Sequence, residues 1–123
     1  MHELSIACDL VESLGKHLDE QAPGAGVRSV LLRVGVMSGV DSQALRWAYD
    51  VAIRDTRFAG SRLEIETVPL VVWCANCQAE QSLENLAPLR CPSCSALTPR
   101  MVRGRELEIL AVELIDAAAP VAG

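Results

Sequence analysis

The apolar and polar residues of the chain recur with two different periods, and these periods predict its helices and strands. Residues 3–20 carry apolar residues at the spacing of an amphipathic helix: Leu4, Ala7, Cys8, Val11, Leu14 and Leu18. Residues 42–57 carry a second such stripe, and Asp41 precedes it as an expected N-cap. Alternation with a period of two predicts strands at 27–36, 62–68 and 106–115. Cys8 lies on the first stripe, so we expect a small buried core residue there.

The alternation in the last of these strands changes phase part-way along. Leu107 and Ile109 follow one phase, whereas Val112 and Leu114 follow the other. The slip predicts either a β-bulge near Leu110–Ala111 or a strand that is buried on both faces.

The order of elements is helix, strand, helix, strand, an inserted segment, and a last strand. We therefore expect an α+β fold, in which a three-stranded sheet carries two helices on one face. Pro69 and Gly104 bound the insertion. The predicted domains are a discontinuous α+β domain, residues 1–69 and 104–123, and an inserted zinc-ribbon module, residues 70–103.

The insertion holds two Cys-x-x-Cys pairs, Cys74 with Cys77 and Cys91 with Cys94, separated by thirteen residues. This is the typical spacing of a tetrahedral zinc site with four cysteine ligands. Four thiolates fill the four positions of such a site, which indicates a structural ion rather than a catalytic one. The residues between the pairs offer few side chains for a core, so we expect the module to depend on its metal.

Other chemistries can use the same cysteines. Iron in a rubredoxin-like site takes the same four ligands, and spacing does not distinguish the two metals. Two disulfides would require an oxidising compartment, yet the sequence opens Met-His-Glu-Leu without the features of an export signal. A redox Cys-x-x-Cys is normally single. Structural zinc is the preferred interpretation.

The composition of the chain limits the cellular compartment and the classes of binding partner that we expect. The net charge of −5 argues against a nucleic-acid surface, which is normally basic. No apolar run approaches the ~20 residues that span a bilayer. We expect a cytoplasmic protein that binds neither nucleic acid nor membrane.

The first three residues, Met1-His2-Glu3, carry the remaining candidate chemistry. A free α-amine, the next amide nitrogen and the His2 imidazole can chelate one ion, and such nitrogen donors favour Ni(II) or Cu(II) over Zn(II). The Glu3 carboxylate or another acid such as Asp41 could complete the coordination. A structural explanation stands beside this one, because Glu3 also suits the first turn of a helix. His17 has no histidine or other metal ligand at i±4, so we expect it to be a surface residue.

Three segments together resemble the HypA/HybF family: Met1-His2-Glu3-Leu4-Ser5-Ile6, Val34-Gly35-Val36-Met37-Ser38-Gly39-Val40, and the four-cysteine pattern. The members of this family are nickel metallochaperones for nickel–iron hydrogenase and, in some bacteria, for urease. The resemblance implies a Ni(II) site at the Met1 amine, His2 and Glu3, and an acidic residue implicated in nickel handling at Asp41. It also implies structural Zn(II) at Cys74, Cys77, Cys91 and Cys94.

The resemblance implies partners as well. These are a nickel-handling GTPase, the hydrogenase large subunit as recipient, and in some bacteria the urease maturation proteins. Some relatives carry histidines beside the cysteine pairs, but this sequence has none there. On this interpretation the protein is not an enzyme. Two alternatives stay open from the residues alone: a zinc-ribbon accessory protein of the transcription or RNA machinery, and a hydrolase with an open metal site.

Overall fold

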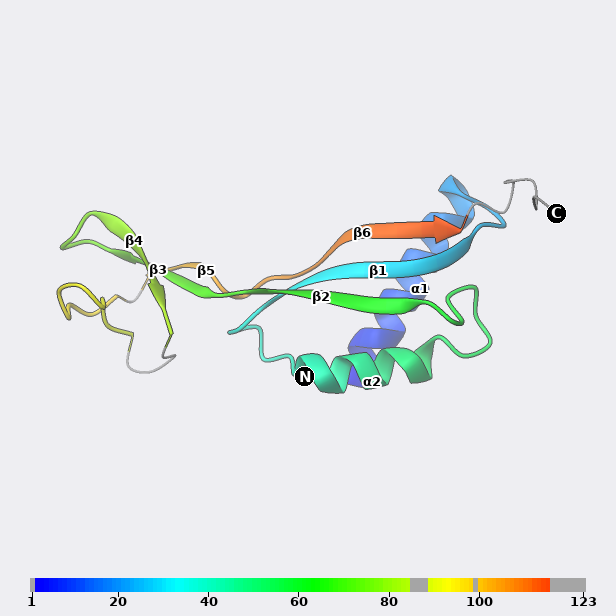
Figure 1. Cartoon of the computed structure of the whole chain (residues 1–123), viewed down its shortest axis with the longest axis horizontal. Coiled ribbons are helices and arrows are strands. Elements are labelled where there is room, and N and C mark those ends of the chain that lie inside the picture. Colours follow the sequence, from blue (N-terminus) through cyan, green and yellow to red (C-terminus); the bar gives the residue numbers. More distant parts are fainter. Residues whose placement is uncertain (1, 85–88, 99, 116–123) are drawn as a thin grey trace. The chain divides into compact units, whose positions relative to one another are not determined.

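The structure is a computed structural model that describes residues 2–84, 89–98 and 100–115. Its elements are two helices and six strands: α1 Glu3–Gln21, β1 Gly26–Gly35, α2 Ser42–Ala52, β2 Arg62–Val68, β3 Leu70–Cys74, β4 Ala79–Leu83, β5 Arg100–Arg103 and β6 Leu107–Ile115. They form two three-stranded sheets with strand orders β2-β1-β6 and β4-β3-β5 (Figure 1). The expected α+β fold is confirmed. No helix in the described residues is both long and apolar enough to cross a membrane.

The chain divides into two compact units. The first contains residues 1–32, 41–65 and 109–123, and the second contains residues 33–40 and 66–108. The second unit therefore includes the ends of strands that the sequence analysis assigned to the α+β domain. The assignment of nickel binding to one domain and zinc binding to the other stays a prediction.

Apolar side chains from the helices and the sheet form the core of the first unit. Helix α1 buries one narrow stripe, and α2 packs beside it with Leu45, Ala48 and Tyr49. The Tyr49 hydroxyl is paired with the Ser61 hydroxyl at 2.7 Å, so this buried phenol keeps a hydrogen bond. The part of the central strand β1 that belongs to this unit contributes a row of buried aliphatic residues, Val27, Val30 and Leu32.

Three sequence expectations are wrong in detail. Cys8 is exposed rather than buried, because the buried stripe of α1 runs through Ala7, Leu10, Leu14 and Leu18 and Cys8 lies beside it. Helix α2 ends at Ala52 rather than near residue 57. The chain turns after Ile53, and Asp55 takes a left-handed conformation that a helix does not allow.

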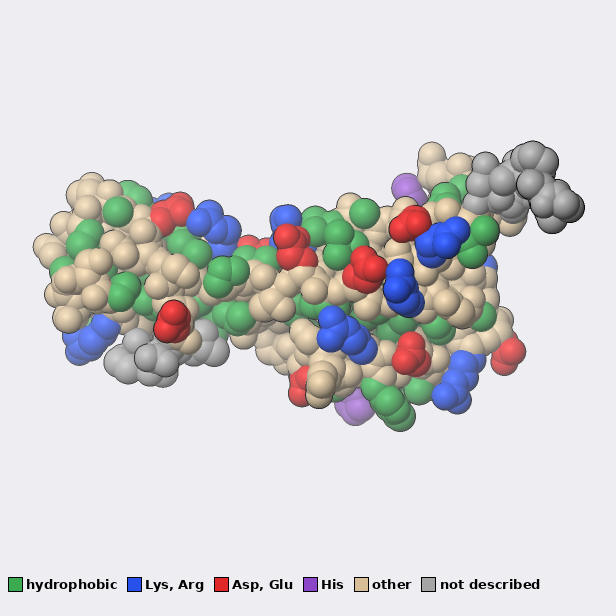
Figure 2. Space-filling view, in the orientation of Figure 1, with side chains coloured by type: hydrophobic (Ala, Val, Ile, Leu, Met, Phe, Trp, Pro, Cys, Tyr) green, Lys and Arg blue, Asp and Glu red, His purple; other side chains and the backbone are tan. Residues whose placement is uncertain are grey.

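Strand β6 is also not buried on both faces, since most of its residues are exposed. The contacts with β1 show a continuous antiparallel register: Arg28 pairs with Glu113, Arg33 with Glu108, and the Gly35 amide with the Glu106 carbonyl. The two residue numbers add to 141 in each of these pairs. The offset between the strands is therefore the same along their length, and neither strand contains the extra residue that a β-bulge requires. The exposed face carries acidic and basic side chains next to one another (Figure 2).

The second unit has a small core of its own. Leu70, Val72 and Leu83 are buried together and are packed by partly buried side chains, Met37, Leu89 and Met101. Strand β3 is its centre and pairs with β4 on one side and β5 on the other. Leu83 and Leu89 come from the stretch that the sequence analysis regarded as poor in core residues, so the metal is not the sole organising element of this unit.

Candidate metal centres

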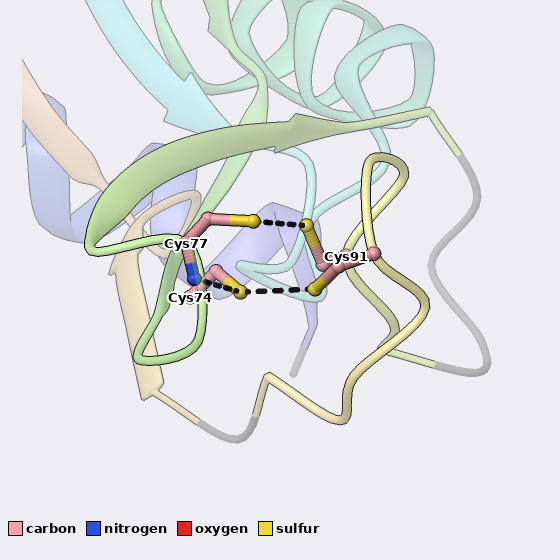
Figure 3. A group of neighbouring side chains, drawn as sticks. Cys74, Cys77 and Cys91 are labelled. Atoms are coloured by element: carbon pink, nitrogen blue, oxygen red, sulfur yellow. Dashed lines mark hydrogen bonds between the residues drawn. The ribbon is translucent and has the colours of Figure 1, made fainter.

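The four cysteines of the second unit converge on one point. Cys74 closes β3, and the chain turns back into β4 so that Cys74 lies opposite Ala79. Cys77 lies in this turn, and Cys91 and Cys94 come from a second turn. Their sulfur atoms all lie within 4.8 Å of one another, and Figure 3 shows the labelled cysteines from the two turns facing each other. Cys74 and Cys91 are buried, whereas the other two are more accessible.

The two turns are built alike. In each, the residue directly after the second cysteine has a positive φ, 54° at Gln78 and 65° at Ser95. This conformation turns the chain back after each cysteine pair. Within each turn, one backbone amide also donates to a sulfur. The Cys77 amide donates to Cys74 Sγ at 3.4 Å, and the Ser93 amide donates to Cys91 Sγ at 3.4 Å. Such amide donors stabilise thiolates, which are the form that binds a metal.

The sulfur separations fit a tetrahedral ion. Two sulfurs that each lie about 2.3 Å from zinc in a tetrahedron are about 3.8 Å apart. The observed separations are 3.5 Å for Cys74 to Cys94 and 3.8 Å for Cys77 to Cys91. A disulfide would bring two sulfurs to about 2.05 Å, and all four cysteines are free. The geometry therefore favours a metal site over two disulfides.

The electrostatics of the thiols also suit a cation. The Asn76 side chain, the Ala96 backbone and neighbouring thiols donate to Cys94 and lower its pKa to about 6. The pKa of Cys77 is raised to about 12, chiefly by hydrogen bonds with Cys94, Cys74 and Cys91. One thiolate thus forms readily, but a second one beside it needs a positive charge. Sequence reasoning missed Asn76, although its place inside the first Cys-x-x-Cys pair is a usable signal.

The N-terminal candidates lie in the first unit. His2 precedes α1 as its N-cap residue, but its side chain makes no capping hydrogen bond. Glu3 begins the helix, and its Oε2 accepts a hydrogen bond from the Asp41 amide at 3.3 Å. Met1 lies outside the described residues. Residues that are thirty-eight positions apart in the sequence are therefore neighbours at the N-terminal ends of both helices.

Asp41 has a structural role in this arrangement. Its Oδ1 accepts from the Gln43 amide at 2.9 Å and from the Ala44 amide at 3.2 Å, which caps α2. The expected N-cap is confirmed. Within the described part of the chain, the four cysteines are the group of metal-binding side chains whose ligand atoms lie close together, and His2, Glu3 and Asp41 do not form such a group.

Comparison with known proteins decides the family. The family model described as "Hydrogenase/urease nickel incorporation, metallochaperone, hypA" matches residues 1–114. The chain belongs to the HypA family. It is 46% identical to the hydrogenase maturation factor HypA of Roseiflexus sp. over 94% of both chains, and 42% identical to that of Chloroflexus aurantiacus over 92% of this chain and 98% of the relative.

Solved structures of HypA proteins share this fold. The solution structure of the Ni metallochaperone HypA from Helicobacter pylori matches with a TM-score of 0.63 at 20% identity, over 94% of this chain and 98% of that one. A second solution structure of a HypA protein matches with a TM-score of 0.66 at 19% identity, over 94% and 97% of the two chains. The resemblance that the sequence motifs indicated is confirmed, and the chain is a member of a nickel-incorporation family with a four-cysteine metal site.

Proposed function

We propose that this protein binds Ni(II) at its N-terminus and delivers it to the large subunit of nickel–iron hydrogenase. The Met1 amine and the His2 imidazole are the proposed primary donors, with Glu3 and Asp41 as the acidic residues beside them. The observation that carries the proposal is the hydrogen bond from the Asp41 amide to the Glu3 carboxylate. This bond holds the start of α1 beside the acidic cap of α2. The ligand atoms of His2, Glu3 and Asp41 do not converge there without an ion, so nickel binding would require these exposed side chains to rotate toward it.

The N-terminal ends of α1 and α2 suit an ion that is bound and then released, rather than one that stays bound. The His2 side chain is exposed and makes no capping hydrogen bond. Its imidazole can therefore coordinate nickel without the loss of a hydrogen bond that stabilises α1. Both helices direct the positive ends of their dipoles here, and these ends favour the carboxylates but not a cation. Such a site holds nickel moderately and leaves it open to attack by an incoming donor, which is the property a carrier needs.

The four cysteines have a different proposed role. Cys74, Cys77, Cys91 and Cys94 would hold Zn(II), which would fix the two turns and add to the stability of the second unit. With all four protein ligands in place, such an ion leaves no open position for a substrate. We therefore propose a carrier that is not an enzyme and that acts in the cytoplasm. Its proposed partners are the hydrogenase large subunit, a nickel-handling GTPase and, where urease is present, the urease maturation proteins.

The charges of the second unit do not favour nucleic-acid binding. The second unit contains five arginines and five glutamates, so its charges cancel. Arg103 is paired with Glu80 at 2.6 Å, and Arg90 donates to the Ser95 carbonyl. A surface of this kind lacks the excess positive charge that binds phosphates.

The test is a nickel titration by calorimetry on untagged, zinc-loaded protein. His2→Ala should lower nickel affinity at least about tenfold, with zinc content and helical signal unchanged. His17→Ala is the matched control, because it removes the other histidine, which is exposed on α1. Equal nickel affinity in the His2→Ala protein and the parent would show that the N-terminal assignment is wrong.

A further inference from the structure

One edge of the first sheet carries apolar side chains in solvent. Strand β6 is the last in the order β2-β1-β6, and among the described residues no strand pairs with its outer side. Within the first unit, Ile109 is 41%, Leu110 is 38% and Ile115 is 47% exposed. Soluble proteins rarely leave an apolar edge strand open, because its free backbone groups can pair with another strand.

A groove runs beside this edge. Residues 109–112 and Leu114 of β6 form one wall, and α1 forms the other with Leu14, His17 and Leu18. Its volume is about 500 Å³ and its lining is mostly apolar. A strand added to β6 would lie over the groove, and its inward side chains could fill it. The edge therefore offers both backbone pairing and a place to bury side chains.

The usual devices that protect an edge strand are missing from β6. Residues 107–115 contain no lysine, arginine or proline. The two acids of the strand are already neutralised, since Glu113 pairs with Arg28 at 3.1 Å and Glu108 with Arg33 at 3.3 Å. A second strand can thus approach β6 without meeting an uncompensated charge.

We propose that β6 is the interface for a second copy of this chain, joined by antiparallel pairing of the two β6 strands. The strand is its own complement. When Val112 lies opposite Val112 of the other copy, Ile109 faces Ile115, Leu110 faces Leu114 and Glu113 faces Ala111. The position opposite Glu108 is Asp116, which lies outside the described residues, and Glu108 is already paired with Arg33. A two-fold axis through Val112 gives a closed dimer and one continuous six-stranded sheet. The inference does not depend on the proposed nickel function.

Sedimentation equilibrium on zinc-loaded protein across the micromolar range tests this interface. Leu110→Lys places a charge on the edge at an exposed position, and it should weaken self-association at least about tenfold. Trp47→Lys is the matched control, because Trp47 is a 68% exposed apolar residue on α2, and it should leave self-association unchanged. Amide hydrogen exchange at residues 109–115 should slow as the parent concentration rises, but not in Leu110→Lys.

Several results would overturn the proposal. The parent protein could stay monomeric throughout the micromolar concentration range. Alternatively, Leu110→Lys and Trp47→Lys could weaken association equally, which would indicate non-specific association through exposed apolar residues. Protection of residues 109–115 that is independent of concentration, and lost in a chain ending at Ile115, would mean that the following residues cover the strand. If Leu110→Lys fails to fold, Ile115→Lys at the strand end provides the same test.

Discussion

Asp41 has two roles in this account, and one pair of substitutions separates them. Its Oδ1 caps α2 through two backbone amides, and its carboxylate is also a candidate nickel ligand. Asp41→Ala removes both roles. Asp41→Asn removes the charge only, because asparagine caps helices about as well as aspartate.

The expected stability changes follow from the capping bonds. Loss of an N-cap costs about 1 kcal/mol, and with a urea dependence of about 2 kcal/mol/M the unfolding midpoint should fall by about 0.5 M. The described helices both belong to the first unit, so circular dichroism at 222 nm reports on that unit. Asp41→Ala should show this shift, whereas Asp41→Asn should stay within a few tenths of a kcal/mol. An unshifted midpoint in Asp41→Ala would refute the capping argument.

The nickel measurement uses the same proteins. An amide oxygen is a weaker ligand than a carboxylate, so Asp41→Asn should bind nickel about tenfold more weakly even though α2 remains capped. Asp50→Asn is the control, because Asp50 is an exposed acid on the same helix and its loss changes the net charge equally. If Asp41→Asn binds nickel as tightly as Asp50→Asn, the Asp41 carboxylate is not a ligand.

Three further predictions concern the start of the chain, Gly35 and the cysteines. Residues added before Met1 should weaken nickel binding, because they convert the amine into an amide; calorimetry on tagged and untagged protein should differ. Gly35→Ala should destabilise the second unit by several kcal/mol, on the order of other severe overpacking, since a Cβ there would lie 2.1 Å from the Gly104 carbonyl oxygen; thermal unfolding should show it, and an unchanged midpoint would disprove the clash. Cys74→Ser should abolish zinc binding and loosen the sheet around β3; unchanged zinc by elemental analysis would contradict its role as a ligand.

Periodicity and motif spacing predicted the fold well because they reflect burial directly. The helix of α1, the alternation of β1 and the Asp41 cap are local patterns, and each is present in the structure. The stripe of α1 was predicted only in part, because Leu10 is buried and Leu4 is exposed. The cysteine spacing predicted a cluster that the sulfur positions confirm. These features depend on residues that lie close together in sequence.

The features that sequence reasoning missed depend on distant neighbours. Cys8 is one position away from the buried stripe, and only the packing direction of α1 decides its exposure. The pattern of apolar residues in β6 did not predict which of its side chains are buried. Strand β6 lies at a sheet edge, where apolar residues are left exposed to solvent. The bond between Glu3 and Asp41 joins two helix ends, and no local pattern predicts it.

The most direct test of the proposed nickel site is X-ray absorption at the nickel edge of untagged, zinc-loaded protein. We expect nitrogen and oxygen atoms around nickel, including imidazole, and we expect the imidazole signal to be lost in His2→Ala. Zinc-edge data from the same sample should show four sulfur ligands at about 2.3 Å. Sulfur around nickel would place the metal at the cysteines and contradict the N-terminal site.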